Sequence, residues 1–145
     1  ERLAEYLRDH PETNFFHFNV DLAQGPCVIK RLRGCGAGCE YVAITPEGDI
    51  YPCHQFVGNE DYKLGSLYDG TFDKELSGRF AGLNIYTREE CKDCWARFYC
   101  SGGCSASNLL VNGDIKKPHR VGCELERKRL ECAIALRAIA AGMAE

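Results

Sequence analysis

Residues 91–104 constrain this chain more than any other part of its sequence, because they hold four thiols in a C-x2-C-x5-C-x3-C arrangement. The run is short, contains glycine and carries charge, so an ordinary apolar core cannot organise its backbone. Soft thiolates at such spacing suit a zinc ion or an iron–sulfur cluster better than they suit packing. The four residues are Cys91, Cys94, Cys100 and Cys104.

The composition limits the compartment and the partners. The chain has ten cysteines, enough for two four-ligand centres with two left over, and its net charge of −3 over 145 residues gives no basic surface for nucleic acid. The longest apolar stretch, 133–144, contains Arg137 and is too short to cross a bilayer, and the first residues lack a signal-peptide core. We therefore expect a cytoplasmic protein without nucleic-acid or membrane partners, in which disulfides are disfavoured. The six cysteines outside the run are Cys27, Cys35, Cys39, Cys53, Cys123 and Cys132.

A β-hairpin is predicted in the first half of the chain. Residues 41–44 and 50–51 read as strands and flank Pro46-Glu47-Gly48-Asp49, which is a turn signal. Such a hairpin would bring Cys39 and Cys53 close together at the open ends of its strands. With the helices below, it predicts a small α+β fold in which irregular cysteine-rich loops and helices wrap around the metal centres.

Helical periodicity and end signals predict several helices. Thr87-Arg88-Glu89-Glu90 fits a capping box that leads into the cysteine run. Residues 16–20 alternate apolar and polar side chains, which is a strand pattern. The predicted helices cover residues 3–10, 73–80, 105–110 and 124 to about 141.

The cysteine spacing fits iron–sulfur ligation. Such clusters combine a short chelate with distant cysteines that close the fold around the cluster. Cys91 and Cys94 fit the chelate, and Cys100 can reach the same cluster. Cys104 follows Gly102-Gly103 and can turn toward a second cluster, as the last cysteine of a run does in two-cluster ferredoxins.

The remaining thiols leave an alternative open. Cys123 can complete a four-cysteine set, while Cys27 is more simply a spare thiol and Cys132 a packing residue on the last helix. One or two structural zinc sites are the alternative to iron and sulfide. Zinc ribbons usually pair two C-x2-C motifs, however, and this chain contains only one.

The order of the cysteines resembles a known family. Cys35, then Gly48-x4-Cys53, then the run 91–104 and finally Cys123 resemble the seven-cysteine SPASM pattern, found in the C-terminal part of radical SAM (S-adenosylmethionine) enzymes that modify peptides. The residues around Cys35 and Cys53 resemble, more narrowly, the maturases of six-cysteine (SCIFF, ranthipeptide-type) precursor peptides, which form thioether crosslinks. The resemblance covers about residues 25–131.

This resemblance implies two auxiliary 4Fe–4S clusters. Cys39 lies where some relatives have a fourth ligand of the first cluster, whereas other maturases leave one iron open there for a substrate thiolate. The position of Cys39 favours ligation. The implied ligands are Cys35, Cys39, Cys53 and Cys104 for cluster I, and Cys91, Cys94, Cys100 and Cys123 for cluster II.

The radical SAM signature C-x3-C-x2-C occurs nowhere in the chain. The C-x3-C pairs at 35–39 and 100–104 are not followed by a third cysteine at the required spacing. We therefore expect S-adenosylmethionine and its own 4Fe–4S cluster to belong to another part of a larger enzyme, and this chain should not initiate radical chemistry alone. Residues 1–24 would end the radical SAM barrel, and residues 25–145 would form the SPASM domain with its C-terminal helix.

The resemblance also implies a function. The domain would serve a maturase of a ribosomally made, cysteine-rich precursor peptide, by accepting electrons or by positioning the substrate thiolate. Flavodoxin or ferredoxin would be the external reductant. The alternatives from other classes are a stand-alone ferredoxin-like electron carrier and a zinc-stapled structural module, while sulfatase maturases share the same cysteine frame.

Overall fold

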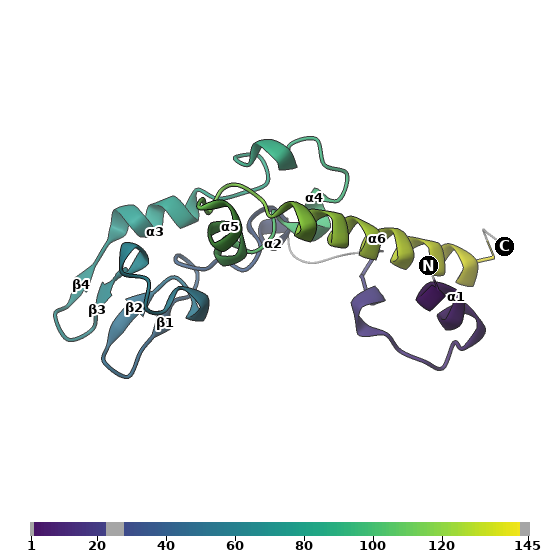
Figure 1. Ribbon diagram of the computed structural model, residues 1–145, viewed down its shortest axis with the longest axis horizontal. Coiled ribbons are helices and arrows are strands. Elements are labelled where there is room, and N and C mark those ends of the chain that lie inside the picture. Colours follow the sequence, from purple (N-terminus) through teal and green to yellow (C-terminus); the bar gives the residue numbers. More distant parts are fainter. Residues whose placement is uncertain (1, 23–27, 143–145) are drawn as a thin grey trace. The chain divides into compact units, whose positions relative to one another are not determined.

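Short helices and strands joined by long loops make up most of the protein, and one longer helix, α6, lies toward the C-terminus (Figure 1). A computed structural model describes residues 2–22 and 28–142, so the expected boundary between residues 24 and 25 and the residue Cys27 lie outside the described ranges. The described chain divides into two units, residues 28–119 and residues up to 22 together with those from 120 onward. The elements are α1 (Arg2–Asp9), η1 (Phe16–Phe18), α2 (Val28–Arg33), β1 (Ala43–Ile44), β2 (Asp49–Tyr51), η2 (His54–Phe56), η3 (Glu60–Tyr62), β3 (Gly65–Ser66), β4 (Thr71–Phe72), α3 (Lys74–Ala81), η4 (Glu89–Cys91), α4 (Arg97–Cys100), α5 (Ser105–Asn112) and α6 (Arg120–Ala140), where η marks a 3-10 helix.

Four strands form one antiparallel sheet in the order β1-β2-β3-β4. The predicted hairpin is confirmed as β1 and β2, with Ile44 opposite Ile50. Its turn closes where the Gly48 N–H donates to the Thr45 carbonyl at 2.9 Å, and Gly48 has a φ of +82°, which glycine adopts without steric cost. The strands β3 and β4 were not predicted, because two residues are too few to show a period of two.

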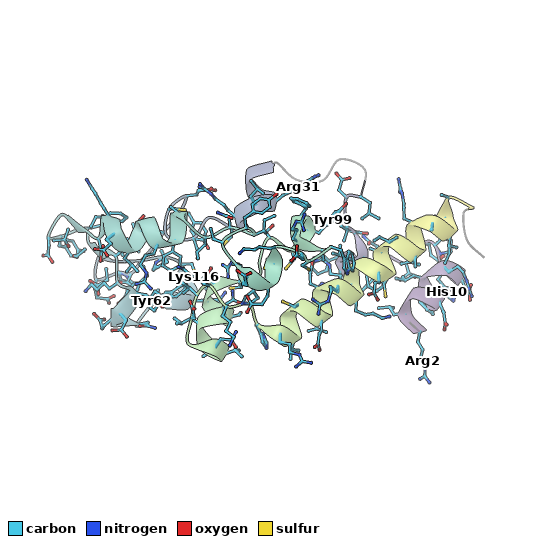
Figure 2. All side chains as sticks on the ribbon, turned by 90° about the horizontal axis from the view of Figure 1, so that it is seen from above. Arg2, His10, Arg31, Tyr62, Tyr99 and Lys116 are labelled. Carbon is cyan, nitrogen blue, oxygen red and sulfur yellow. The ribbon has the colours of Figure 1, made fainter. Side chains whose placement is uncertain are left out.

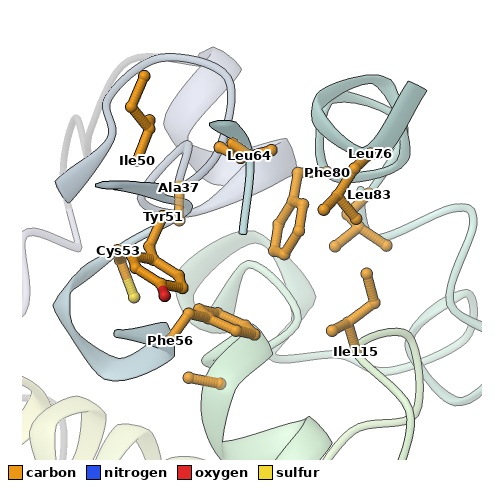
Figure 3. Close-up of a cluster of buried hydrophobic side chains, with 11 residues drawn as sticks. Ala37, Ile50, Tyr51, Cys53, Phe56, Leu64, Leu76, Phe80, Leu83 and Ile115 are labelled. Carbon is orange, nitrogen blue, oxygen red and sulfur yellow. The ribbon is translucent and has the colours of Figure 1, made fainter. Parts of the chain in front are cut away.

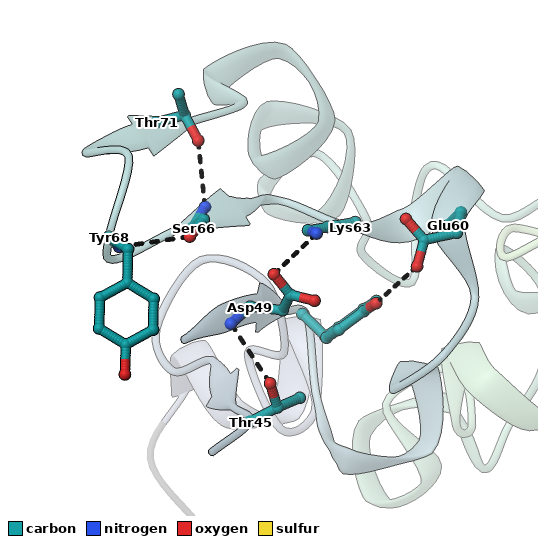
Figure 4. Close-up of polar contacts among 8 residues, drawn as sticks. Thr45, Asp49, Glu60, Lys63, Ser66, Tyr68 and Thr71 are labelled. Carbon is teal, nitrogen blue, oxygen red and sulfur yellow. Dashed lines mark hydrogen bonds and ion pairs between the residues drawn. The ribbon is translucent and has the colours of Figure 1, made fainter. Parts of the chain in front are cut away.

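Polar contacts fix the register of the sheet (Figure 4). The Lys63 ammonium lies 2.7 Å from the Asp49 carboxylate, and the Tyr51 hydroxyl donates to the Glu60 carboxylate at 3.1 Å. The first contact joins β2 to the segment between η3 and β3, and the second joins β2 to η3. Partly exposed pairs of this kind contribute little free energy, so their effect is mainly to align the strands.

A cluster of buried side chains joins β2, η2, α3 and α5 (Figure 3). The Phe56 ring packs edge-on against Phe80 with centroids 5.4 Å apart, and Leu64 is fully buried beside them. Burying one such side chain stabilises the fold by about 1.5–3 kcal/mol. Cys53 belongs to the same cluster and is 4% exposed, so the core holds the backbone of this cysteine in place.

Two helices have well-defined ends in the structure. Asp73 caps α3, where its carboxylate accepts a hydrogen bond from the Leu76 N–H at 2.8 Å. α5 ends at Gly113, which has a left-handed φ of +70°. The helices predicted at residues 73–80 and 105–110 are therefore confirmed.

The predicted capping box at residues 87–90 is wrong. Thr87 does not cap a helix: its hydroxyl accepts from the Asn84 N–H at 2.9 Å and lies 3.1 Å from the Gly82 carbonyl. The segment is a tight turn followed by the single 3-10 turn η4. The hydrogen bonds between Asn84 and Thr87 form in place of the hydrogen bonds of a capping box.

In the other unit, α1 and η1 pack against α6. The predicted N-terminal helix is confirmed as α1, but the strand predicted at residues 16–20 is wrong, because Phe16–Phe18 form a 3-10 turn. The rings of Phe15 and Phe18 meet edge-on at 5.0 Å, which a turn of three residues allows and an extended strand does not. The Arg129 Nε donates to the His17 carbonyl at 2.5 Å and ties this turn to α6.

The last helix begins earlier than predicted. α6 starts at Arg120 rather than at residue 124, so Cys123 lies inside its first turn. Within the ranges that the structure describes, no helix, α6 included, is long and apolar enough to span a membrane.

Candidate metal centre

The thiols required for metal binding are present as reduced cysteines. All nine cysteines in the described ranges are without a disulfide, and they include every residue predicted as a ligand. Cys53 and Cys91 are buried, while Cys35, Cys39 and Cys104 are exposed. Reduced thiols on loops, some reachable from solvent, are the donor set that an iron–sulfur cluster uses.

Tyr41 connects two of the cysteines predicted for cluster I. Its hydroxyl donates toward the Cys35 thiol, with the oxygen 4.0 Å from the sulfur. Partial burial, followed by the negative charges and hydrogen bonds of the Cys35 and Cys53 sulfurs, raises the pKa of Tyr41 to about 12. Both cysteines therefore lie within electrostatic reach of one phenol at the open end of the hairpin.

Glycines shape the loop that carries Cys35. The Gly38 N–H lies 2.9 Å from the Pro52 carbonyl, which ties this loop to the residue before Cys53. Gly38 has a φ of +79°, and a Cβ at this position would lie 2.8 Å from the Phe80 ring. Only glycine satisfies both the backbone conformation and the close approach to the core.

Cys39 has a different environment. Its thiol donates to the Gly36 carbonyl at 3.4 Å, within its own loop. The contacts of Tyr41 therefore place Cys35 and Cys53 near one another, while the Cys39 thiol has its hydrogen bond inside the loop 36–39. The assignment of Cys39 as a ligand stays a prediction.

Cys104 comes to the same region through Gln55. The Gln55 amide nitrogen lies 3.7 Å from the Cys104 sulfur, and Gln55 belongs to η2, immediately after Cys53. Cys104 also precedes α5, where the backbone N–H groups of Ser107 and Ala106 face its sulfur. Burial opposes ionisation, but these hydrogen bonds together lower the pKa of the Cys104 thiol below its ordinary value.

Three of the cysteines predicted for cluster II, Cys91, Cys94 and Cys100, lie on successive tight turns. The Cys94 N–H donates to the Cys91 carbonyl at 3.1 Å, and the Cys100 N–H donates to the Ala96 carbonyl at 3.0 Å. The chain then reverses through Ser101 and the two following glycines, all with left-handed φ. These turns follow from sequence-local hydrogen bonds, so the spacing of the run sets the positions of its own backbone.

The loop that carries Cys35 and the run 91–104 approach each other beside α2 and α4, which are in contact. A Cβ at Gly34 would lie 3.5 Å from the Ser101 Cβ. Gly34 precedes Cys35 and Ser101 follows Cys100, so ligands predicted for different clusters lie on neighbouring stretches of backbone.

Cys123 is half-buried in α6, in the other unit. Throughout residues 2–22 and 28–142, no three His, Cys, Asp or Glu side chains converge closely enough to hold a metal ion.

Arg88 is the residue near these thiols that sequence reasoning missed. It is 3% exposed, and its Nη1 donates to the carbonyls of Ile115 at 2.8 Å and Lys116 at 3.0 Å (Lys116 is labelled in Figure 2). Burial lowers the pKa of Arg88, while the negative charges of nearby groups raise it. Those groups are Cys91, Cys100, Asp114 and Cys104. The sequence signal for this residue was an arginine three positions before Cys91, the first cysteine of the run 91–104. The pattern of residues 87–90 instead indicated a capping box that includes Arg88.

The donor set therefore fits an iron–sulfur centre. It combines reduced thiols, amide and hydroxyl donors next to sulfur, and a buried guanidinium whose Nε has no hydrogen-bond partner. Hydrogen bonds to sulfur and buried positive charge are the groups through which proteins tune such clusters.

Comparison with known proteins leads to the same chemistry. Residues 35–95 match the family model of SPASM, described as an iron–sulfur cluster-binding domain. The chain is 31% identical over 111 residues to the mycofactocin maturase MftC of Mycobacterium ulcerans, which covers 72% of this chain and 29% of that protein. It is 28% identical over 102 residues to the PqqA peptide cyclase of Xanthomonas axonopodis pv. citri, which covers 66% and 27%.

A third relative is the serine-type anaerobic sulfatase-maturating enzyme of Klebsiella aerogenes, 28% identical over 85 residues, or 57% of this chain and 20% of that enzyme. The chain spans about a quarter of the length of the curated relatives that it matches. These relatives are radical SAM maturases of peptides or proteins. Over residues 35–95 the chain therefore matches the SPASM iron–sulfur cluster-binding domain, and over a longer range it is similar to radical SAM maturases of peptides and proteins.

Proposed function

We propose that this chain is the auxiliary-cluster part of a radical SAM maturase and that it holds two 4Fe–4S clusters. The observation that supports the proposal is that residues at one end of the hairpin lie beside the sulfurs of cysteines that are far apart in sequence. Tyr41 faces the Cys35 and Cys53 sulfurs, and Gln55 contacts the Cys104 sulfur. These three cysteines would ligate cluster I.

Cys91, Cys94 and Cys100 would ligate cluster II, with Cys123 as the fourth residue. When bound, such clusters accept and donate single electrons and can bind a substrate thiolate at an open iron. The protein's own contribution is to hold the thiols, to donate hydrogen bonds to them and to keep a positive charge beside them. Cys39 would be the fourth ligand of cluster I, which would favour electron transfer over thiolate binding at that cluster.

The substrate of the whole enzyme would be a peptide. Two relatives are named for a peptide cyclase and a mycofactocin maturase, and a third for the maturation of sulfatases. We propose a ribosomally made, cysteine-rich precursor peptide in which a thioether crosslink forms, because residues around Cys35 and Cys53 resemble the ranthipeptide maturases. A flavodoxin or ferredoxin would supply electrons.

The test is the iron, sulfide and zinc content of the anaerobically reconstituted protein, measured together with Mössbauer spectra. Two 4Fe–4S clusters correspond to about eight irons and eight sulfides beyond those of the S-adenosylmethionine-binding cluster. A distinct iron subsite would mean that cluster I has an open position and that Cys39 does not ligate. About two zinc ions per chain without sulfide would contradict the proposal and leave a structural module.

A further inference from the structure

Arg88 combines deep burial with uncharged acceptors. Its Nη1 donates to two main-chain carbonyls, and its Nη2 donates to the Ser105 hydroxyl at 3.2 Å. All three acceptors are neutral. A guanidinium stays charged at any pH at which the protein is folded, and a buried charge is costly unless negative charge lies close by.

One donor of this side chain is left over. The Arg88 Nε is buried and has no hydrogen-bond partner. It lies against Gly102, because a Cβ built on Gly102 would be 2.8 Å from both the Cδ and the Nε of Arg88. Gly102 stands midway between Cys100 and Cys104, so the unpartnered N–H lies against the backbone that joins the two cysteines.

Cysteines surround this position in the chain. The Cys91 N–H donates to the Arg88 carbonyl at 3.0 Å, and Ser105, which accepts from the guanidinium, directly follows Cys104. Cys91 and Cys100 are proposed ligands of cluster II, and Cys104 is a proposed ligand of cluster I. A single buried cation is therefore next to both ligand sets.

We propose that Arg88 is a positioning residue for both clusters: its fixed charge offsets the negative charge of the surrounding thiolates, and its Nε–H is the donor for a sulfur acceptor. This inference rests on the proposed function, since it needs the clusters to be present. A nearby positive charge favours the added electron, so Arg88 raises the reduction potentials of both clusters. Because the same guanidinium also donates hydrogen bonds to the carbonyls of residues 115 and 116, it attaches the start of the run 91–104 to the segment of Ile115, which belongs to the buried cluster.

The experiment compares variants of the reconstituted full-length protein by redox titration followed by EPR. Arg88→Gln removes the positive charge, and Arg88→Lys keeps the charge but lacks the planar guanidinium with its several N–H donors. Arg79→Gln is the control, because Arg79 is an exposed arginine of α3 and its loss changes the net charge equally. We expect Arg88→Gln to lower the reduced-to-oxidised ratio of both clusters at a fixed potential at least tenfold, or about 59 mV for a one-electron couple. Arg79→Gln should leave the ratio unchanged.

The outcomes separate this inference from the proposed function. A wild-type protein without auxiliary iron and sulfide contradicts the function itself. Loaded wild type together with identical potentials in Arg88→Gln and Arg79→Gln overturns only the inference. If Arg88→Gln does not retain its clusters, Arg88→Lys is the deciding variant. Clusters retained in Arg88→Lys support a role of the positive charge. Clusters lost in Arg88→Lys as well would mean that only the hydrogen bonds of Arg88 to residues 115 and 116 matter, which overturns the inference.

A pair of glycine variants tests the Nε–H without removing the charge. Gly102 and Gly103 have φ values of +85° and +73°, so alanine strains the backbone similarly at both. Only the Cβ at position 102 meets Arg88, whereas the one at position 103 has Asn108 Oδ1 as its nearest neighbour, at 3.8 Å. We expect a lowered potential in Gly102→Ala relative to Gly103→Ala, and equal potentials in the two would overturn this part of the inference.

Discussion

Gln55 donates a hydrogen bond to Cys104 across 49 positions of sequence, with its Nε2 3.7 Å from the sulfur. The contact joins η2, directly after Cys53, to the residue that precedes α5. It makes the proposed cluster I a long-range feature, because its ligands come from the hairpin and from the end of the cysteine run. Its donor also changes the chemistry of the thiol that it contacts.

Replacing Gln55 by Met should raise the pKa of the Cys104 thiol, because the amide donor helps to lower it. The thiolate fraction at neutral pH then falls, and Cys104 should be alkylated several-fold more slowly in the metal-free protein. Mass spectrometry of iodoacetamide-treated samples between pH 6 and 9 measures this rate, with Cys35 in the same digest as the control. An unchanged rate at Cys104 would contradict the contact.

The same shift has a consequence for stability. The pKa of Cys104 is lower in the folded protein than in the unfolded chain, so ionisation of this thiol stabilises the fold above the unfolded pKa. That contribution is lost as the pH falls through the folded-state pKa. Gln55→Met should therefore reduce the dependence of unfolding free energy on pH in this window, which urea titrations at several pH values can detect.

Tyr41 should remain protonated at unusually high pH. Its pKa is raised to about 12 by partial burial and by the Cys35 and Cys53 sulfurs. Between pH 9 and 11, the wild-type protein and Tyr41→Phe should therefore show the same tyrosinate absorbance near 295 nm, with circular dichroism to confirm that both are folded. A larger absorbance in the wild type, with a midpoint near pH 10, would mean that Tyr41 does not face these sulfurs.

Cys91→Ala should remove cluster II and destabilise the unit of residues 28–119, because metal binding in such loops supplies folding free energy. The reconstituted variant should contain about four fewer irons and four fewer sulfides than the wild type. Cys132→Ala is the matched control, since Cys132 is a half-buried cysteine of α6 outside the proposed ligand sets. Full iron in Cys91→Ala, or equal iron loss in the control, would exclude the assignment.

Gly38→Ala and Gly58→Ala separate backbone strain from packing. Both glycines have left-handed φ, +79° and +84°, which costs an alanine about 1–2 kcal/mol. A Cβ at Gly38 would also lie 2.8 Å from the Phe80 ring, whereas nothing lies within 4 Å of one at Gly58. We expect Gly38→Ala to lose about 1–3 kcal/mol more unfolding free energy than Gly58→Ala in urea titrations. Equal losses would show that the loop carrying Cys35 does not pack on α3.

Local signals predicted local structure well. The turn at Gly48 and the helices at residues 73–80 and 105–110 are as predicted. Each is set within a few residues of sequence, by a glycine with positive φ at Gly48 and Gly113 and by the side-chain cap of Asp73. The prediction of a capping box before Cys91 was wrong because the Thr87 hydroxyl accepts a hydrogen bond from the nearby Asn84 N–H instead. The strand predicted at residues 16–20 was wrong because an alternating pattern of five residues does not distinguish an extended segment from a turn whose aromatic rings pack edge-on.

The sequence by itself determined the donor chemistry: the number and order of the thiols, their turns within the run 91–104, and the match of residues 35–95 to an iron–sulfur cluster-binding domain. The tertiary structure decided which groups stand beside those thiols. Gln55 reaches Cys104, and Arg88 reaches the carbonyls of residues 115 and 116, only because the hairpin, α3 and α5 share one core. Spacing along a chain sets contacts over a few residues, whereas contacts between distant segments depend on how buried side chains pack, which no local pattern encodes.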